Sequence, residues 1–298
     1  MGAGSLLFMA FLYGWFGILI RFVSQSGIPA FYQICIRSFA TSAILILILL
    51  ISKGKIKIPS LVHIPKYLFR SLFGFVSFSL SYYAFINLPI SVAYFFFYGG
   101  FLIGGFLLGI FLYKEKLNTT KLISCLLAFI GIVVVFSKQE NVIISGLYIF
   151  MAFASGLFSV LWSSMPKLLP SDYIDLESNL FDTISVLIFA ILTTFLLREK
   201  ISFPKDSFSW FMQIAFVAQA VINGQLMITG FQNIDSQVGA VIMLLEIVFA
   251  GIFSYFIFSE IPSSYTLVGS LFIIFASALP VIVKLNSHKP KLIDAAKS

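Results

Sequence analysis

Two stretches of the chain decide its fold: Phe111-Leu112-Tyr113-Lys114-Glu115-Lys116-Leu117 and Phe256-Ile257-Phe258-Ser259-Glu260-Ile261-Pro262. Each closes a long apolar run, and their two glutamates lie 145 positions apart. A polar cluster typical of a helix start follows each stretch, Asn118-Thr119-Thr120 in the first case and Ser263-Ser264 in the second. A final apolar run follows each cluster. The chain is therefore predicted to consist of two similar halves, and in membrane proteins such repeats place a site between them.

The composition is that of a membrane protein. Hydrophobic residues make up 60% of the 298 positions and charged residues 10%, whereas a soluble domain carries about 25% charged residues. No polar stretch is long enough to form a separate soluble domain. The net charge of +7 therefore does not indicate nucleic-acid binding, because no soluble basic domain is present to provide it.

The sequence lacks the parts of an enzyme or a metal site. Cys35 and Cys125 lie inside apolar runs, where packing is the expected role. His63 and His288 are isolated in polar segments. There is no phosphate-binding loop and no nucleophile elbow. We expect no enzymatic activity and no cofactor, so that any transport is driven by a gradient or by exchange.

An all-α integral membrane fold is predicted, with ten transmembrane helices arranged as two inverted five-helix repeats. A spanning helix needs about 20 mostly apolar residues, and the apolar runs are too long and too uniform for barrel strands. Five spans per half is an odd number, so the second half enters the membrane from the opposite side. The expected units are a first repeat at 1–143, a second repeat at 144–285 and a tail at 286–298. The expected spans are 6–24, 28–51, 66–87, 90–113, 119–137, 144–165, 176–197, 208–230, 236–259 and 264–284.

The basic residues predict the orientation of the chain. Cytoplasmic loops are enriched in Lys and Arg, and these cations also meet anionic lipid. If both termini are cytoplasmic, that side holds Lys53, Lys55, Lys57, Lys66, Arg70, Lys114, Lys116, Lys121, Lys167, Lys284, Lys289, Lys291 and Lys297. The outer side then holds only Lys138, Arg198, Lys200 and Lys205. We therefore expect both termini in the cytoplasm.

The chain resembles the EamA-type members of the drug/metabolite transporter superfamily over roughly residues 5–284. The resemblance rests on Tyr13-Gly14-Trp15, on Arg37, on Ala84 to Ala93 continuing to Glu115, and on Leu244 to Ala250 continuing to Glu260. One departure is Ile247, where the family often has a proline after the ninth-span glutamate; the first-half equivalent, Leu102, is not proline either. The resemblance implies a bacterial cytoplasmic (inner) membrane carrier of a small organic solute.

Three ionisable residues inside the spans are candidate substrate ligands, because charged groups at this depth need a compensating role. Glu246 lies near the midplane, where apolar surroundings favour the protonated form of a carboxyl group. It is predicted to exchange a proton or bind a substrate ammonium, or else to lock two helices by hydrogen bonding. Arg37 must meet either a structural carboxylate or a substrate carboxylate. Asp182, near Asn179 and Glu177, joins the candidate set.

Amides and aromatic residues complete the candidate substrate-binding set. Gln219 and Asn223 are four positions apart and share a helix face, so they form either a cavity wall or interhelical hydrogen bonds. Aromatic side chains either line a pocket or belong to packing and interfacial belts. Those with a candidate role are Trp15, Tyr82, Tyr94, Tyr98 and Trp162.

Other singled-out residues have a structural interpretation. The pairs Gly100/Gly104 and Gly105/Gly109 predict close helix packing in the fourth span, with a sliding surface as a secondary role. Glu115 and Glu260 are expected to anchor helix ends or to pair with Lys114 or Lys116, and not to bind substrate.

The favoured function is export of an amino acid or a derivative by alternating access, with a coupled proton or counter-substrate. The alternatives are uptake or exchange of a metabolite or cofactor such as S-adenosylmethionine or a nucleotide-like solute, and drug efflux. A membrane scaffold is the rival from another class, but a scaffold does not require polar groups at midplane depth. The sequence does not specify an oligomeric state.

Overall fold

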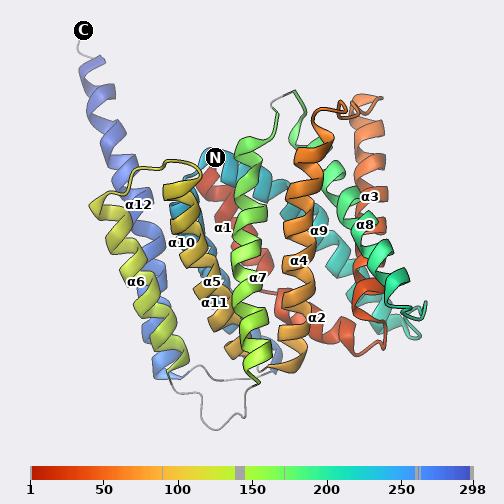
Figure 1. Ribbon diagram of the computed structural model, residues 1–298. Helices are drawn as coiled ribbons and strands as arrows, with labels where there is room; N and C mark the ends of the chain where they lie inside the picture. The colour runs from red at the N-terminus through yellow and green to blue at the C-terminus, as the bar shows by residue number, and fades with distance from the viewer. Residues whose placement is uncertain are drawn as a thin grey trace.

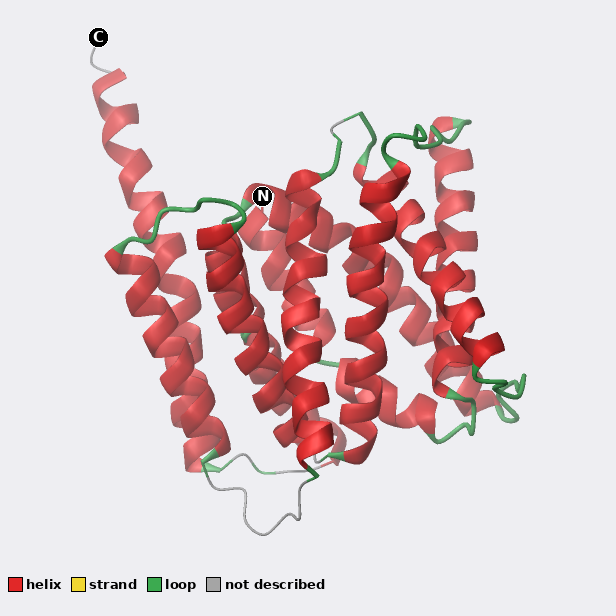
Figure 2. Ribbon diagram, viewed as in Figure 1, coloured by secondary structure: helices red, strands yellow, loops and turns green. Residues whose placement is uncertain are grey.

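The computed structural model describes residues 2–88, 90–137, 145–170, 172–258, 261 and 263–295. Within them every regular element is a helix, as predicted (Figures 1 and 2). The helices are α1 (Gly2–Tyr13), α2 (Phe16–Ser24), α3 (Ala30–Lys53), α4 (Ile64–Asn87), α5 (Ile90–Phe111), α6 (Thr119–Phe136), α7 (Gly146–Ser164), the short η1 (Met165–Leu168), α8 (Asp175–Leu196), α9 (Ser207–Asn233), α10 (Ser236–Met243), α11 (Leu245–Phe258) and α12 (Ser264–Ala295).

Nine spans in the described part of the chain are long and apolar enough to cross a membrane. The remaining expected span, 66–87, corresponds to α4, a helix of 24 residues that is less apolar than these nine spans. It carries Arg70 and the serines Ser71, Ser77, Ser79 and Ser81, all buried among neighbouring helices rather than facing lipid. The molecule is a multi-pass membrane protein, and its most polar spanning helix is shielded by its neighbours.

The two halves run in opposite directions through the bundle. α1 begins on the same face on which α12 ends, which we call the terminal face, whereas α7 begins on the opposite face (Figure 1). Helices that correspond in the two halves pack against each other, as α3 does with α8, α6 with α12, and α5 with α10. The contact between α4 and α7 likewise corresponds to that between α9 and α1. This arrangement confirms the predicted inverted repeat.

Two spans that were predicted to be continuous are broken near their middle. The first breaks between Tyr13 and Phe16, and the ninth breaks at Leu244. At each break a backbone N–H bonds three residues back instead of four: Trp15 to the Leu12 carbonyl at 3.3 Å, and Ile247 to the Leu244 carbonyl at 3.0 Å. Ile247 is not a proline, so the ninth-span break does not depend on a proline kink.

The glycines of α5 serve two different contacts. A Cβ on Gly104 would lie 2.6 Å from the Val160 side chain of α7, and one on Gly100 would collide with the Phe153 carbonyl oxygen. Gly105 and Gly109 instead face α10, where a Cβ on Gly109 would lie 2.6 Å from Gln237 Cγ. Both glycine pairs therefore permit close packing, each against a different helix of the second half.

Several expected boundaries differ from or fall outside the described structure. The boundary between the two repeat units, expected at residues 143 and 144, lies outside the described residues, as do Glu260 and Lys138. The expected tail, 286–298, continues α12 as helix as far as Ala295.

Candidate functional site

A cavity of about 110 Å³ lies where the two halves meet. Its walls come from α1, α2, α3, α4, α5, α7, α8, α9, α10 and α11, so both repeats contribute. Five of the predicted substrate-binding residues border it: Arg37, Tyr98, Trp162, Asp182 and Glu246. The remaining lining is mostly aromatic rings, methionines and hydroxyl groups.

Arg37 is held on α3 by aromatic rings and not by a carboxylate. Its guanidinium carbon lies 4.3 Å from the centre of the Phe216 ring and 4.8 Å from that of Phe78, which are distances of cation–π contacts. Its buried Nε has no hydrogen-bond partner. Among the described residues no acidic side chain forms an ion pair with it. Of the two alternatives that the sequence left open, the structural ion pair is absent from the described residues, so the guanidinium borders the cavity without a carboxylate partner there.

The buried ion pair of this region belongs to Arg70 and Asp182 instead. Arg70 was counted among the cations of the cytoplasmic side; its side chain is 0% exposed and its Nη1 lies 2.9 Å from Asp182 Oδ1. Ser71 Oγ donates to the same carboxylate at 2.6 Å, and Trp162 Nε1 donates to it at 2.8 Å. The sequence did not indicate this pair, because a count of cations near helix ends does not register a carboxylate on another helix.

This network fixes the orientation of Trp162. The indole nitrogen is bonded to Asp182, and the Arg70 guanidinium lies 5.5 Å from the ring centre. Gly74 provides the space, because a Cβ there would lie 2.8 Å from the indole nitrogen. Asp182 therefore borders the cavity with both oxygens already engaged, and the face of Trp162 forms a preorganised part of the wall.

Glu246 lies in the first turn of α11, directly after the break in the ninth span. The start of a helix favours a negative charge, because its free N–H groups point toward it. Tyr98 donates its hydroxyl hydrogen to Glu246 Oε2, and the Glu246 residue is 4% exposed. Tyr94 stacks on Tyr98 with ring centres 6.1 Å apart and accepts a hydrogen bond from the Gly17 N–H at 3.1 Å. Two helix breaks are thus linked through two tyrosines of α5.

Five predicted residues do not line the cavity. Tyr94 lies behind Tyr98, as described above. Gln219 Nε2 donates to the Leu12 carbonyl at 2.7 Å, an interhelical hydrogen bond beside the break in the first span. Trp15 packs against Phe253 with ring centres 4.5 Å apart. Tyr82 is buried among the aromatic residues of the core, and Asn223 is buried without a hydrogen-bond partner for either amide atom.

Sequence reasoning did not select several residues that line the cavity. Tyr13 does so at the end of α1, in the same cavity as Arg37, Glu246 and Asp182. Hydroxyl groups also face the cavity, from Ser38, Thr41, Ser77, Ser81, Ser159, Ser163 and Thr183. Their spacing could have indicated part of this lining. Thr41 is three positions from Ser38 and four from Arg37, so it shares a helix face with each of them.

In the described part of the chain no three His, Cys, Asp or Glu side chains come together as they would around a metal ion. The arrangement therefore offers a single cationic ligand, one carboxylate held by tyrosine, and an aromatic wall.

Comparison with known proteins concerns the fold and the family of the chain. One solved structure, described only as a crystal structure of a protein, superposes with a TM-score of 0.75 at 16% identity, over 96% of this chain and 98% of that one. At that identity the likeness concerns the fold alone. A search of curated proteins found no match. The profile of the EamA-like transporter family matches residues 1–137 and again residues 146–282, so the chain belongs to the EamA-like transporter family.

Proposed function

We propose that the protein is a secondary carrier of a small organic metabolite that bears a carboxylate, by preference an amino acid or a derivative that leaves the cell. The observation that carries the proposal is Arg37, a guanidinium that borders the cavity with no carboxylate partner among the described residues. An unpaired charge inside a membrane protein is unfavourable unless a ligand compensates it. A substrate carboxylate matches the planar fork of the guanidinium.

Glu246 supplies the second polar contact. Its carboxyl group borders the same cavity and accepts a hydrogen bond from Tyr98. An ammonium group and a proton compete for such a site, so the binding of one displaces the other. Between these two ends, Trp162 and Phe78 form an apolar wall that accommodates the side chain of the solute.

Transport proceeds by alternating access between the two inverted repeats, driven by a gradient or by exchange with a counter-substrate. The protein resides in the bacterial cytoplasmic membrane with the terminal face in the cytoplasm. The basic segment at Lys53, Lys55 and Lys57 supports this orientation, because it connects α3 and α4 on that face (Figure 1). The two repeats, 1–143 and 144–285, are the two transporting units.

The test uses matched solutes in proteoliposomes. An amino acid, the amine that lacks its carboxylate and the acid that lacks its amine are each tested as competitors for uptake of the labelled amino acid. We expect the amine to compete least, since it cannot engage Arg37, and Arg37→Gln to abolish the difference between amine and acid. Arg198→Gln is the control, because Arg198 lies after the end of α8, away from the cavity. Equal competition by all three solutes in the unmodified protein would refute the carboxylate assignment.

A further inference from the structure

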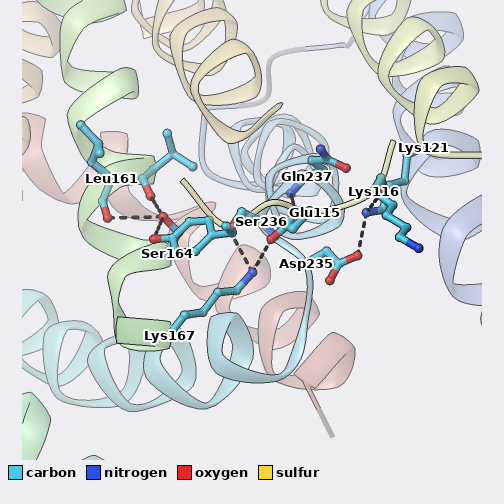
Figure 3. A network of polar contacts seen from close by, with 11 residues as sticks. Glu115, Lys116, Lys121, Leu161, Ser164, Lys167, Asp235, Ser236 and Gln237 are labelled. Atoms are coloured by element: carbon cyan, nitrogen blue, oxygen red, sulfur yellow. Dashed lines mark hydrogen bonds and ion pairs between the residues drawn. The ribbon is translucent and has the colours of Figure 1, made fainter. Parts of the chain in front are cut away.

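On the terminal face, four segments from the two repeats meet in a charged cluster that the substrate site does not use. Glu115 follows α5, Lys121 lies in α6, Lys167 lies in η1, and Asp235 and Ser236 begin α10 (Figure 3). The sequence predicted Lys114 or Lys116 as partners of Glu115. Its partner is instead Lys167, whose Nζ lies 2.6 Å from Glu115 Oε1.

The carboxylate of Glu115 also holds the start of α10. Glu115 Oε1 accepts the N–H of Ser236 at 2.7 Å, and Oε2 accepts that of Gln237 at 3.3 Å. The free N–H groups at a helix start form a favourable site for a carboxylate. Glu115 belongs to the first repeat and α10 to the second, so this contact ties the two repeats together.

Two lysines reinforce the contact from either side. Lys167 Nζ also donates to Ser236 Oγ at 3.0 Å and lies 4.8 Å from the centre of the Tyr113 ring. Lys121 Nζ lies 2.7 Å from Asp235 Oδ2. Because the Glu115 side chain is 7% exposed and that of Lys167 is 16% exposed, solvent screens their attraction little.

The packing of α10 against α5 would allow the contact between Glu115 and the start of α10 to open. Gly105 and Gly109 let α10 lie directly on α5, and α10 is separated from α11 by the break at Leu244. Gln237 is fully buried in this seam, yet neither atom of its amide has a hydrogen-bond partner. The closed arrangement thus contains an unsatisfied polar group, which lowers the free energy required to separate the helices.

We propose that Glu115, Lys167 and the first residues of α10 form a lock that closes the cavity on the terminal face. Opening on this face requires α10 to swing away from α5 about the break at Leu244, and so to withdraw its N–H groups from Glu115. The role of the lock in transport rests on the proposed function, but the lock itself can be tested without any substrate.

The experiment measures access to the cavity from one side. Cys35 and Cys125 are replaced by alanine, Ser159→Cys supplies a reporter that lines the cavity, and a charged maleimide that does not cross membranes is added to the terminal face of oriented vesicles. We expect Glu115→Gln to raise the labelling rate at least about tenfold, because removal of one partner from a largely buried pair leaves the other uncompensated. Lys116→Gln, which changes an exposed neighbour, should leave the rate unchanged.

A double-mutant cycle separates the lock from general loosening. Lys167→Gln should raise labelling as Glu115→Gln does, and the double variant should add little to either, because both remove one interaction. Gly109→Ala, whose Cβ would lie 2.6 Å from Gln237 Cγ and 2.7 Å from Glu115 Oε2, should act in the same direction. Unchanged labelling in the two single variants, or effects that simply multiply, would overturn the lock. Loss of all transport with the labelling pattern intact would instead refute the transport proposal and leave the lock standing.

Discussion

The Arg70–Asp182 pair gives the most quantitative prediction about this fold. Replacement of Asp182 by leucine leaves a guanidinium that is 0% exposed without its carboxylate. Breaking one side of a buried pair costs about 3–5 kcal/mol of unfolding free energy. Ser71 and Trp162 lose their acceptor in the same variant, and each orphaned donor adds about 1 kcal/mol.

The second replacement should reverse much of that loss. When Arg70→Leu is combined with Asp182→Leu, no buried charge is left unpaired, and apolar residues commonly replace such pairs at little net loss. We therefore expect the double variant to be more stable than the Asp182 variant, with a coupling free energy of at least about 2 kcal/mol. Asp235→Asn is the matched control. The Asp235 side chain is 53% exposed, so its ion pair with Lys121 should contribute less than about 1 kcal/mol to the unfolding free energy.

The assay is equilibrium unfolding in mixed detergent, followed by circular dichroism so that the signal does not depend on Trp162. Asp182→Leu should be strongly destabilised, the double variant should recover, and Asp235→Asn should resemble the unmodified protein. The argument that Arg70 and Asp182 compensate each other as buried charges would be refuted by either of two results. One is an Asp182→Leu unfolding free energy within about 1 kcal/mol of that of the unmodified protein, and the other is a double variant no more stable than Asp182→Leu.

Three further predictions concern other contacts. Phe216→Leu removes one ring from Arg37 and should raise KM by up to about tenfold, since a desolvated cation–π contact contributes about 1–2 kcal/mol; equal KM values for the two proteins would contradict this. Gly156→Ala should lower stability by about 1–3 kcal/mol, because its Cβ would meet the backbone of α5, whereas Gly99→Ala meets nothing; equal melting temperatures would refute it. Asp206 caps α9 and accepts hydrogen bonds that lower its pKa, so its stabilisation is present above the ordinary value of 3.8 and is lost as the pH falls below it. The difference in melting temperature between Asp206→Ala and the unmodified protein should therefore shrink in acid, and a difference that grows would contradict the capping role.

The repeat and the helical fold were predictable because they depend on local signals. Hydrophobic length identifies a span regardless of its neighbours. The offset between Glu115 and Glu260 requires no knowledge of contacts, and the matches of the family profile to two segments confirmed the two-repeat architecture. The breaks at Gly14–Trp15 and Leu244 were not predictable, because both are stabilised by side chains of other helices. Gln219 donates to the Leu12 carbonyl and Tyr94 accepts the N–H of Gly17, so side chains of two other helices bond to the backbone beside the first break.

Of the candidate site, only the features with a local signal in the sequence were predicted. Arg37 and Glu246 were recognised because a charge inside a span is unusual in any context. The partner of a charge depends on which helices meet, so the sequence did not pair Asp182 with Arg70. Gln219 was expected either at a cavity wall or in an interhelical hydrogen bond, and it forms the second, from α9 to the Leu12 carbonyl of α1.

The most direct test of the central claim is counterflow in proteoliposomes, with labelled amino acids offered outside and the same unlabelled solute inside. The account predicts transient accumulation of a carboxylate-bearing solute that requires the internal solute, and loss of that accumulation in Arg37→Gln protein of unchanged stability. Accumulation at the unmodified rate in the Arg37→Gln protein, or no accumulation of any carboxylate solute by folded protein, would contradict it.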